Sequence, residues 1–181
     1  NEGNLGILKL GSSLQSTDSE VLKAVKRTNL SIDKLRGMRK HKNTEDSDKL
    51  QDYTELIVPL PQQTIRKHFN SLRDAIDVLG MNNIDVHQLT MLRGSQMAVR
   101  SERELYECDI RYRVLVGSLG VYEIGGEDVP ISEIEETVVA NSTLSFDDYI
   151  ECRVMSLLVK IYIDNDPFKE IFGLVRFLGL S

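Results

Sequence analysis

Cysteine, histidine and tryptophan are scarce in this chain of 181 residues, which has two cysteines, three histidines and no tryptophan. Cys108 and Cys152 stand far apart, and neither belongs to a Cys-x2-Cys or Cys-His pattern. A cysteine-rich metal site therefore cannot be built from this chain alone, and we interpret both residues as ordinary thiols. His41, His68 and His87 are isolated from one another, which favours surface or core roles over metal binding.

Long apolar runs and an excess of positive charge are also missing. No stretch approaches the roughly 20 apolar residues that a membrane-spanning helix needs, and the N-terminus lacks the pattern of a signal peptide. We therefore expect no membrane span and a cytoplasmic location. The net charge of -6 and the pI near 5.1 give little support to binding of a phosphate backbone, so nucleic acid is set aside as a direct partner.

Motifs of several common enzyme classes are absent as well. The sequence has no nucleophile motif, no phosphate-binding loop and no glycine-rich dinucleotide fingerprint. The acidic residues Glu133, Glu135 and Glu136 could suggest paired carboxylates, but such a run is more typical of a solvated face.

The first half of the chain alternates between predicted strands and helices. Apolar runs predict strands at residues 5–10, 53–58 and 84–91, and Gly-Ser-Ser at 11–13 predicts a turn after the first. A capping box formed by Thr17 and Glu20 predicts the start of a short helix that continues to Lys26. Long crossovers between apolar strands imply parallel pairing and an α/β architecture.

Two further helices are predicted between the first and third strands, at residues 31–42 and 65–79. The second gives the strongest periodic signal in the chain, because its apolar residues recur at steps of three and four. They are Ile65, Phe69, Leu72, Ile76 and Leu79, followed by Gly80 as the helix end. On this pattern His68 lies on the polar side of the helix.

The pattern changes after Gly94, and we predict a boundary near residue 100 that divides the chain into domains 1–100 and 101–181. The second part is expected to be mixed and mainly helical, with a short helix at 101–107 and short β-runs at 111–139 around a hairpin turn at Gly125 and Gly126. Two helices follow. The first, at 146–163, carries one apolar stripe, and the second begins at Pro167. The stripe is Ile150, Val154, Leu157 and Ile161, and the last helix is expected to bury Phe168, Ile171, Phe172, Val175 and Leu178.

Three blocks of the first half resemble radical S-adenosylmethionine (SAM) enzymes. Residues 14–31 are similar to the region of the fourth barrel strand, 53–64 to the "TE.I.GLPGET" run of the fifth strand, and 86–97 to the sixth strand and its "LLPG..M" loop. Residues 111–114, 135–139 and 143–149 resemble the tail of the subgroup that carries a cobalamin-binding domain. The three blocks occur in the family's order, which makes the resemblance fairly specific.

The resemblance implies the C-terminal part of an open (β/α) barrel, of the TIM-barrel type, followed by the extension. It also implies an enzyme that cleaves SAM at a 4Fe-4S cluster to start radical chemistry, a methylation or a rearrangement, with cobalamin as a possible second cofactor. The Cys-x3-Cys-x2-Cys motif that binds the cluster is absent from this chain. The abrupt start at Asn1 further leads us to expect a fragment, inactive alone, whose partners are the missing N-terminal part and a small-molecule or other substrate.

The resemblance also implies SAM-binding residues at the carboxyl ends of the strands. Gln15 matches a residue that reaches the ribose hydroxyls, or else it helps to cap the next helix. Arg27 matches an arginine that pairs with the SAM carboxylate, or else it is a solvated cation at a helix end. Ile57 and Pro59 would run under the adenine, and Leu89 would lie nearby, although core packing accounts equally for Ile57 and somewhat better for Leu89.

Departures from the family pattern affect the same region. Pro59 and Gln62 replace the two glycines of Gly-Leu-Pro-Gly-Glu-Thr, and proline can neither donate an amide nor take a positive φ. Arg93 stands where the sixth-strand loop commonly has proline. Two other hypotheses therefore stay open: a diverged, non-catalytic α/β binding module, and an unrelated α/β domain.

Overall fold

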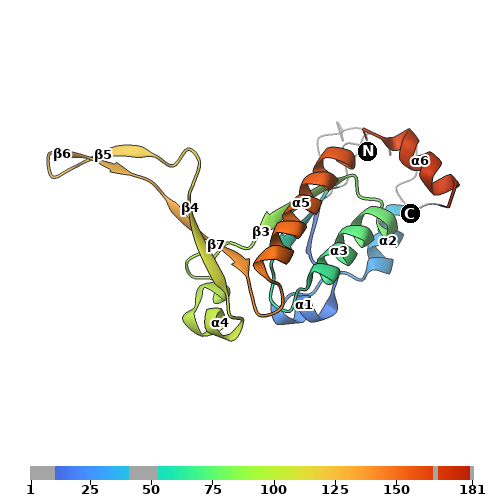
Figure 1. Cartoon of the computed structure of the whole chain (residues 1–181), viewed down its shortest axis with the longest axis horizontal. Coiled ribbons are helices and arrows are strands. Elements are labelled where there is room, and N and C mark those ends of the chain that lie inside the picture. The colour runs from blue at the N-terminus through green and yellow to red at the C-terminus, as the bar shows by residue number, and fades with distance from the viewer. Residues whose placement is uncertain (1–10, 41–52, 165–166, 180–181) are drawn as a thin grey trace, which may run out of the picture.

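A computed structural model describes residues 11–40, 53–164 and 167–179 (Figure 1). Its centre is a parallel three-stranded sheet in the order β1-β2-β3, formed by β1 (Gly11–Gln15), β2 (Tyr53–Val58) and β3 (Asn83–Gln88). The predicted α/β class and the parallel pairing are therefore confirmed. The described residues form small sheets and helices and no closed barrel, so a radical SAM barrel is not confirmed.

The first strand differs from the prediction. The strand expected at 5–10 lies outside the described residues, and the turn predicted at 11–13 is wrong because these residues pair with β2. Gly11 faces Tyr53 and Ser13 faces Glu55, and the register shifts between Ser13 and Gln15. Gly-Ser-Ser is a weak strand sequence, but the polar partner residues on β2 and the ladder hydrogen bonds favour the extended form.

Helix α1 (Ser19–Ala24) begins one residue later than the capping box predicted. Asp18 is the N-cap, and its carboxylate accepts hydrogen bonds of 3.0 Å from the amides of Glu20 and Val21. The predicted cap Thr17 instead donates its hydroxyl to Asp74 Oδ2 at 2.7 Å. Because the Thr17 hydroxyl bonds Asp74, Asp18 caps the helix in its place.

We expect Asp18→Ala to destabilise the chain by about 1 kcal/mol, because two amides of the first turn lose their acceptor. Asp18→Asn should recover most of this loss, since an asparagine side chain caps nearly as well. Urea unfolding of both variants measures the difference. Equal loss in the two variants would mean that the ion pair between Asp18 and Lys67, at 3.4 Å, matters more than the cap.

Helix α3 (Ile65–Arg73) continues as a π-helical turn, η2 (Asp74–Val78), which confirms the long helix predicted at 65–79. Its buried face is rotated from the predicted one, because Ile65, Phe69 and Ile76 are only half-buried. The fully buried residues of this segment are His68, Ser71, Leu72, Ala75 and Leu79. The placement of His68 on a polar face is therefore wrong: the helix turns its small and polar residues inward, where Ser71 Oγ accepts a 3.0 Å hydrogen bond from the amide of Thr17.

One face of the sheet carries the main core. Leu14 and Leu56 of the first two strands pack against three helices: α2 (Ile32–Lys40), α3 and α5 (Phe146–Tyr162). These helices contribute Leu35, Leu72 and Val159 respectively. Figure 1 shows α5 and α3 side by side over this part of the sheet. The second half of the chain thus supplies part of the core of the first.

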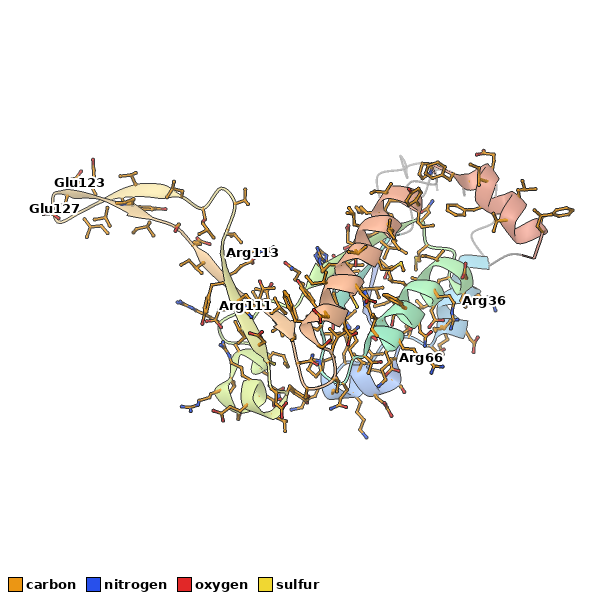
Figure 2. All side chains as sticks on the ribbon, viewed as in Figure 1. Arg36, Arg66, Arg111, Arg113, Glu123 and Glu127 are labelled. Carbon is orange, nitrogen blue, oxygen red and sulfur yellow. The ribbon has the colours of Figure 1, made fainter. Side chains whose placement is uncertain are left out.

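The second half begins with η3 (Gln96–Ala98) and α4 (Arg100–Leu105), and β4 (Asp109–Val114) then pairs antiparallel with β7 (Ile134–Ala140). Between them, β5 (Gly120–Ile124) and β6 (Glu127–Ile131) form a hairpin that turns at Gly125 and Gly126, as predicted. This hairpin is the far end of an arm that projects from the body (Figure 1), and Figure 2 shows Glu123 and Glu127 at its tip. The division near residue 100 stays a prediction.

The apolar residues of the last two helices face outward more than expected. Residues of the predicted α5 stripe are exposed, among them Val154 at 53% and Leu157 at 59%, while Tyr149, Cys152 and Val159 face the core. In α6 (Lys169–Phe177) and the residues flanking it, burial of Ile171 and Leu178 is wrong, because both are more than half exposed. Within residues 11–40, 53–164 and 167–179, no helix is long and apolar enough to cross a membrane.

Candidate functional site

The second face of the sheet carries polar side chains that are half-buried or exposed. Side chains alternate along a strand, so Thr54, Leu56 and Val58 of β2 point into the core, whereas Tyr53 and Glu55 point to the other side. The register places Ser13 and Asp85 beside Glu55, and His87 beside Ile57. These residues are half-buried or exposed, and we call Ser13, Tyr53, Glu55, Asp85 and His87 the open face.

Glu55 is the centre of the open face. Its carboxylate accepts a hydrogen bond from the Tyr53 hydroxyl, and His87 Nε2 lies 3.6 Å from Glu55 Oε1. The hydrogen bond from Tyr53 is the main cause that lowers the pKa of Glu55, with further help from Ser13 and His87 against the opposing effect of burial. The same hydrogen bond is the main cause that raises the pKa of Tyr53 to about 12. At neutral pH the face therefore presents an ionised Glu55 and a protonated Tyr53.

The predicted site residues Gln15, Pro59 and Leu89 lie at the carboxyl edge of this sheet. Gln15 ends β1 opposite Leu56, Pro59 follows β2, and Leu89 follows β3 and donates its amide to Val58 O at 3.0 Å. The carboxyl ends of parallel strands are where α/β folds bind ligands. The structure thus brings these three residues to one edge, as expected, while a role in binding stays a prediction.

Gln15 and Arg27 have unused hydrogen-bonding capacity at this edge. Gln15 is half-buried with φ of +59°, and its side-chain amide has no hydrogen-bond partner among the described residues. Arg27 donates from Nη2 to Ser13 O at 2.5 Å and from Nε to Asn29 Oδ1 at 3.2 Å. Arg27 is therefore anchored against the end of β1 and is not a fully solvated cation, and its remaining N–H groups are available to an anion.

Ile57, Pro59 and Leu89 are packed by this chain itself. Pro59 and Leu89 are buried, and Ile57 packs against the cluster that contains Leu89 and Val138. Leu89 O also accepts a hydrogen bond of 2.9 Å from the amide of Val138, which joins β3 to β7. Core packing accounts for the side chains of Pro59 and Leu89, whereas Gln15, Arg27 and Ile57 are half-buried.

The loop after β2 contains a residue that the sequence analysis did not select. Gln63 is fully buried: its Oε1 accepts from the Leu60 amide at 2.8 Å and its Nε2 donates to Ile57 O at 3.3 Å. Gln62 adopts the positive φ, +61°, for which the family's glycine is suited. The sequence signal for Gln63 was its position at the family's glutamate, and burial of a primary amide there could not be seen from composition.

The same loop is fixed from the distant part of the chain. Asn141 Nδ2 donates to Leu60 O at 3.0 Å, and the Thr143 hydroxyl donates to Gln63 O at 2.8 Å. These bonds hold the loop at the carboxyl edge although proline and glutamine replace both glycines.

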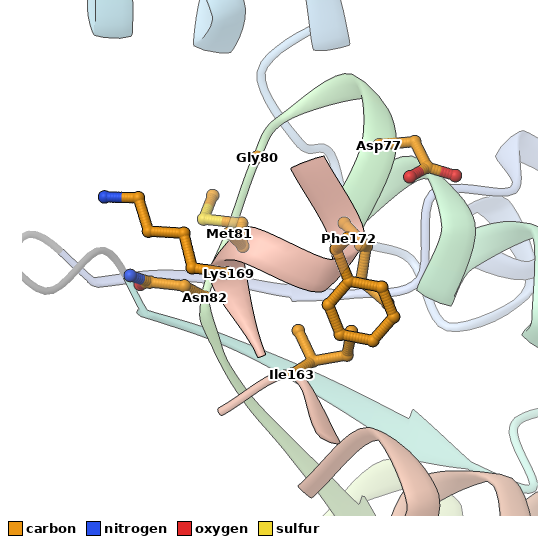
Figure 3. Close-up of a pocket in the computed structure, with 8 residues that line it drawn as sticks. Asp77, Gly80, Met81, Asn82, Ile163, Lys169 and Phe172 are labelled. Carbon is orange, nitrogen blue, oxygen red and sulfur yellow. The ribbon is translucent and has the colours of Figure 1, made fainter. Parts of the chain in front are cut away.

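Two cavities lie at opposite ends of β3. A cavity of about 590 Å³ opens at the carboxyl end, between the loop 90–93 and the start of β7. The other, about 380 Å³, lies at the amino end, where Asn82 and Met81 approach Lys169 and Phe172 of α6 (Figure 3). The first is therefore on the side of Gln15 and Arg27, and the second is remote from them.

The cysteines and histidines do not form a metal centre in the part of the chain that the structure describes, where no three metal-ligating side chains come together. Burial raises the pKa of the Cys108 thiol and raises that of Cys152 to about 12. Protonated, inert thiols fit the interpretation of both as ordinary cysteines.

Comparison with known proteins finds partial similarity to one kind of enzyme. Over 94 residues, 52% of this chain, it is 29% identical to a protein of Streptomyces tokunonensis described as the cobalamin-dependent radical SAM methyltransferase TokK. Over 140 residues, 77% of this chain, it is 26% identical to a 2-(S-pantetheinyl)-carbapenam-3-carboxylate methyltransferase of Streptantibioticus cattleyicolor. No family model matches the chain.

Distant similarity to these methyltransferases supports a relationship to their family. The matched segments are 13% and 19% of the lengths of the two relatives, so the chain spans less than a fifth of either. The activity of a whole protein of this kind is therefore a matter for proposal.

Proposed function

We propose that this chain is the C-terminal part of a cobalamin-dependent radical SAM enzyme, and that its carboxyl edge forms part of the SAM site. The observation that carries the proposal is the convergence of Gln15 and Arg27 on one edge of a parallel sheet in a chain similar to such enzymes. The barrel, the cytoplasmic location and the partnership with the N-terminal part of the same protein belong to the same proposal.

The residues at the edge fit the chemistry of SAM. A free primary amide at Gln15 can donate to and accept from ribose hydroxyls, and the Arg27 guanidinium, held by Ser13 O, can pair with a carboxylate. Ile57, half-buried near the end of β2, contributes an apolar side chain to the same part of the sheet. When bound, SAM at a reduced 4Fe-4S cluster would supply a 5′-deoxyadenosyl radical, and cobalamin would supply a methyl group for transfer. With two cysteines in the chain, the three cluster ligands would come from outside it.

The complete protein that carries this chain should produce 5′-deoxyadenosine from SAM after anaerobic reconstitution. We expect Gln15→Gly and Arg27→Lys each to weaken SAM binding about tenfold, which corresponds to one lost polar contact. Glycine suits the positive φ at Gln15, so the first change removes the amide without straining the backbone. Equilibrium dialysis with labelled SAM measures both effects.

Two matched controls accompany these variants. Gln62→Gly makes the same change at another positive φ, and Arg66→Lys alters an exposed arginine on α3 that is labelled in Figure 2. Neither should weaken SAM binding. If the reconstituted protein neither binds nor cleaves SAM, the non-catalytic binding module becomes the better account.

A further inference from the structure

The cavity of about 590 Å³ at the carboxyl end of β3 has the size of a small-molecule site. Its lining begins at Thr90, directly after Leu89, at the carboxyl end of β3. Part of its lining is apolar, from Met91 and Leu92 of the loop after β3, from Leu115 just after β4 and from Ile134 at the start of β7. Such a surface suits the carbon framework of a ligand.

Most charged groups of this cavity already have partners. Arg103 Nη1 lies 2.5 Å from Glu136 Oε2, and Arg103 Nε donates to Ala98 O at 2.9 Å. Glu135 pairs with Arg113, which Figure 2 shows on the arm. These pairs are neutral overall, and they fix the walls of the cavity without providing a free charge.

Two charges remain. Arg93 and Glu133 both line the cavity, and neither side chain has an ion-pair or hydrogen-bond partner among the described residues. They come from different segments, Arg93 from the loop after β3 and Glu133 from the turn between β6 and β7. Arg93 also replaces the proline that is common at this position in the enzymes that the chain resembles, so this cation is a feature of this chain.

We propose that the cavity binds a zwitterionic small molecule, whose anionic group pairs with Arg93 and whose cationic group pairs with Glu133. One free charge of each sign leaves either singly charged ligand with one wall group unpaired. A ligand that carries both charges on a short apolar framework satisfies both side chains and the apolar lining together. As an account of the substrate, the inference rests on the proposed function.

The test uses the 181-residue chain and three probes of similar size: 6-aminohexanoate, hexanoate and hexylamine. Isothermal titration calorimetry should show that the zwitterion binds about tenfold more tightly than either singly charged probe. Arg93→Gln should lower its affinity to that of hexylamine, and Glu133→Gln should lower it to that of hexanoate. Circular dichroism confirms that the variants stay folded.

Arg111→Gln and Glu123→Gln are the matched controls, since both residues are exposed on the arm and do not line the cavity. They should leave all three affinities unchanged. Equal binding of the three probes, binding that Arg93→Gln does not weaken, or no binding at 10 mM, about the weakest affinity of interest, would each overturn the inference. SAM cleavage by the complete protein is measured separately, so failure here leaves the proposed function standing, and the reverse also holds.

Discussion

Replacement of His68 by phenylalanine should remove an acid-induced loss of stability of about 3 kcal/mol. Burial, with a smaller contribution from the positive charge of Arg153, lowers the pKa of His68 from 6.5 to about 4 in the folded chain. Its Nε2 has no hydrogen-bond partner among the described residues, and Nδ1 lies 3.5 Å from Gln63 Nε2. A proton added to this ring would be a buried charge without a counterion.

The free energy of unfolding depends on pH because His68 has different pKa values in the folded and the unfolded chain. Between pH 6.5 and about 4 the unfolded chain binds a proton at His68 and the folded chain does not, so the free energy of unfolding falls as the pH falls. The stabilising contribution is complete above pH 6.5 and is lost toward pH 4.

Urea unfolding at pH 7.5 and pH 4.5 measures this effect as the difference between the original chain and His68→Phe, which cancels the response of the carboxylates. Arg66→Gln, an exposed change on the same helix, should keep the acid loss. An identical pH response of His68→Phe and the original chain would show that His68 is accessible to protons in the folded state.

Gln63→Met should cost about 3 kcal/mol at neutral pH, because methionine keeps the volume but leaves two buried backbone groups unpaired. These are the Leu60 amide and the Ile57 carbonyl, which Gln63 bonds at 2.8 Å and 3.3 Å. The loss is larger than that of a single surface hydrogen bond because two backbone groups beside the buried Gln63 lose their partner.

Thermal and urea unfolding of Gln63→Met give the magnitude. Gln96→Met is the control, because Gln96 is exposed and its amide bonds only the half-buried Glu102 among the described residues. It should change stability by less than about 0.5 kcal/mol. A similar small effect at Gln63 would mean that water reaches the loop and replaces the amide.

The parallel sheet could be predicted because a strand or helix that buries only one side repeats its apolar residues at a regular spacing. β2 alternates between core and open face, and the helix at 65–79 repeats at helical spacing, so both were recognised. The turn predicted at 11–13 is wrong because Gly-Ser-Ser has no strand signal of its own and is extended through pairing with Tyr53 and Glu55. That pairing cannot be seen before the partner strand is known.

The candidate site was predicted only in part. Gln15 and Arg27 were found through a resemblance, but the open face around Glu55 was not, although alternation at Tyr53 and Glu55 carried a signal. His68 lies three residues after Ile65 and four before Leu72, at positions that the helical period also allows to be buried. We placed His68 on the polar side of the helix because its side chain is polar. In the structure, α3 turns the side that carries Ser71 inward, and His68 is buried with it.

The hydrogen bonds from Asn141 and Thr143 to the loop after β2 join residues that are 80 and 81 positions apart. Contacts of this separation form late, because the entropy of closing a long loop must be overcome first. On the ribosome, β1, β2 and β3 emerge well before residues 141–143 are synthesised. The carboxyl edge is therefore completed only after residues 141–143 have emerged, and until then the loop lacks these two bonds.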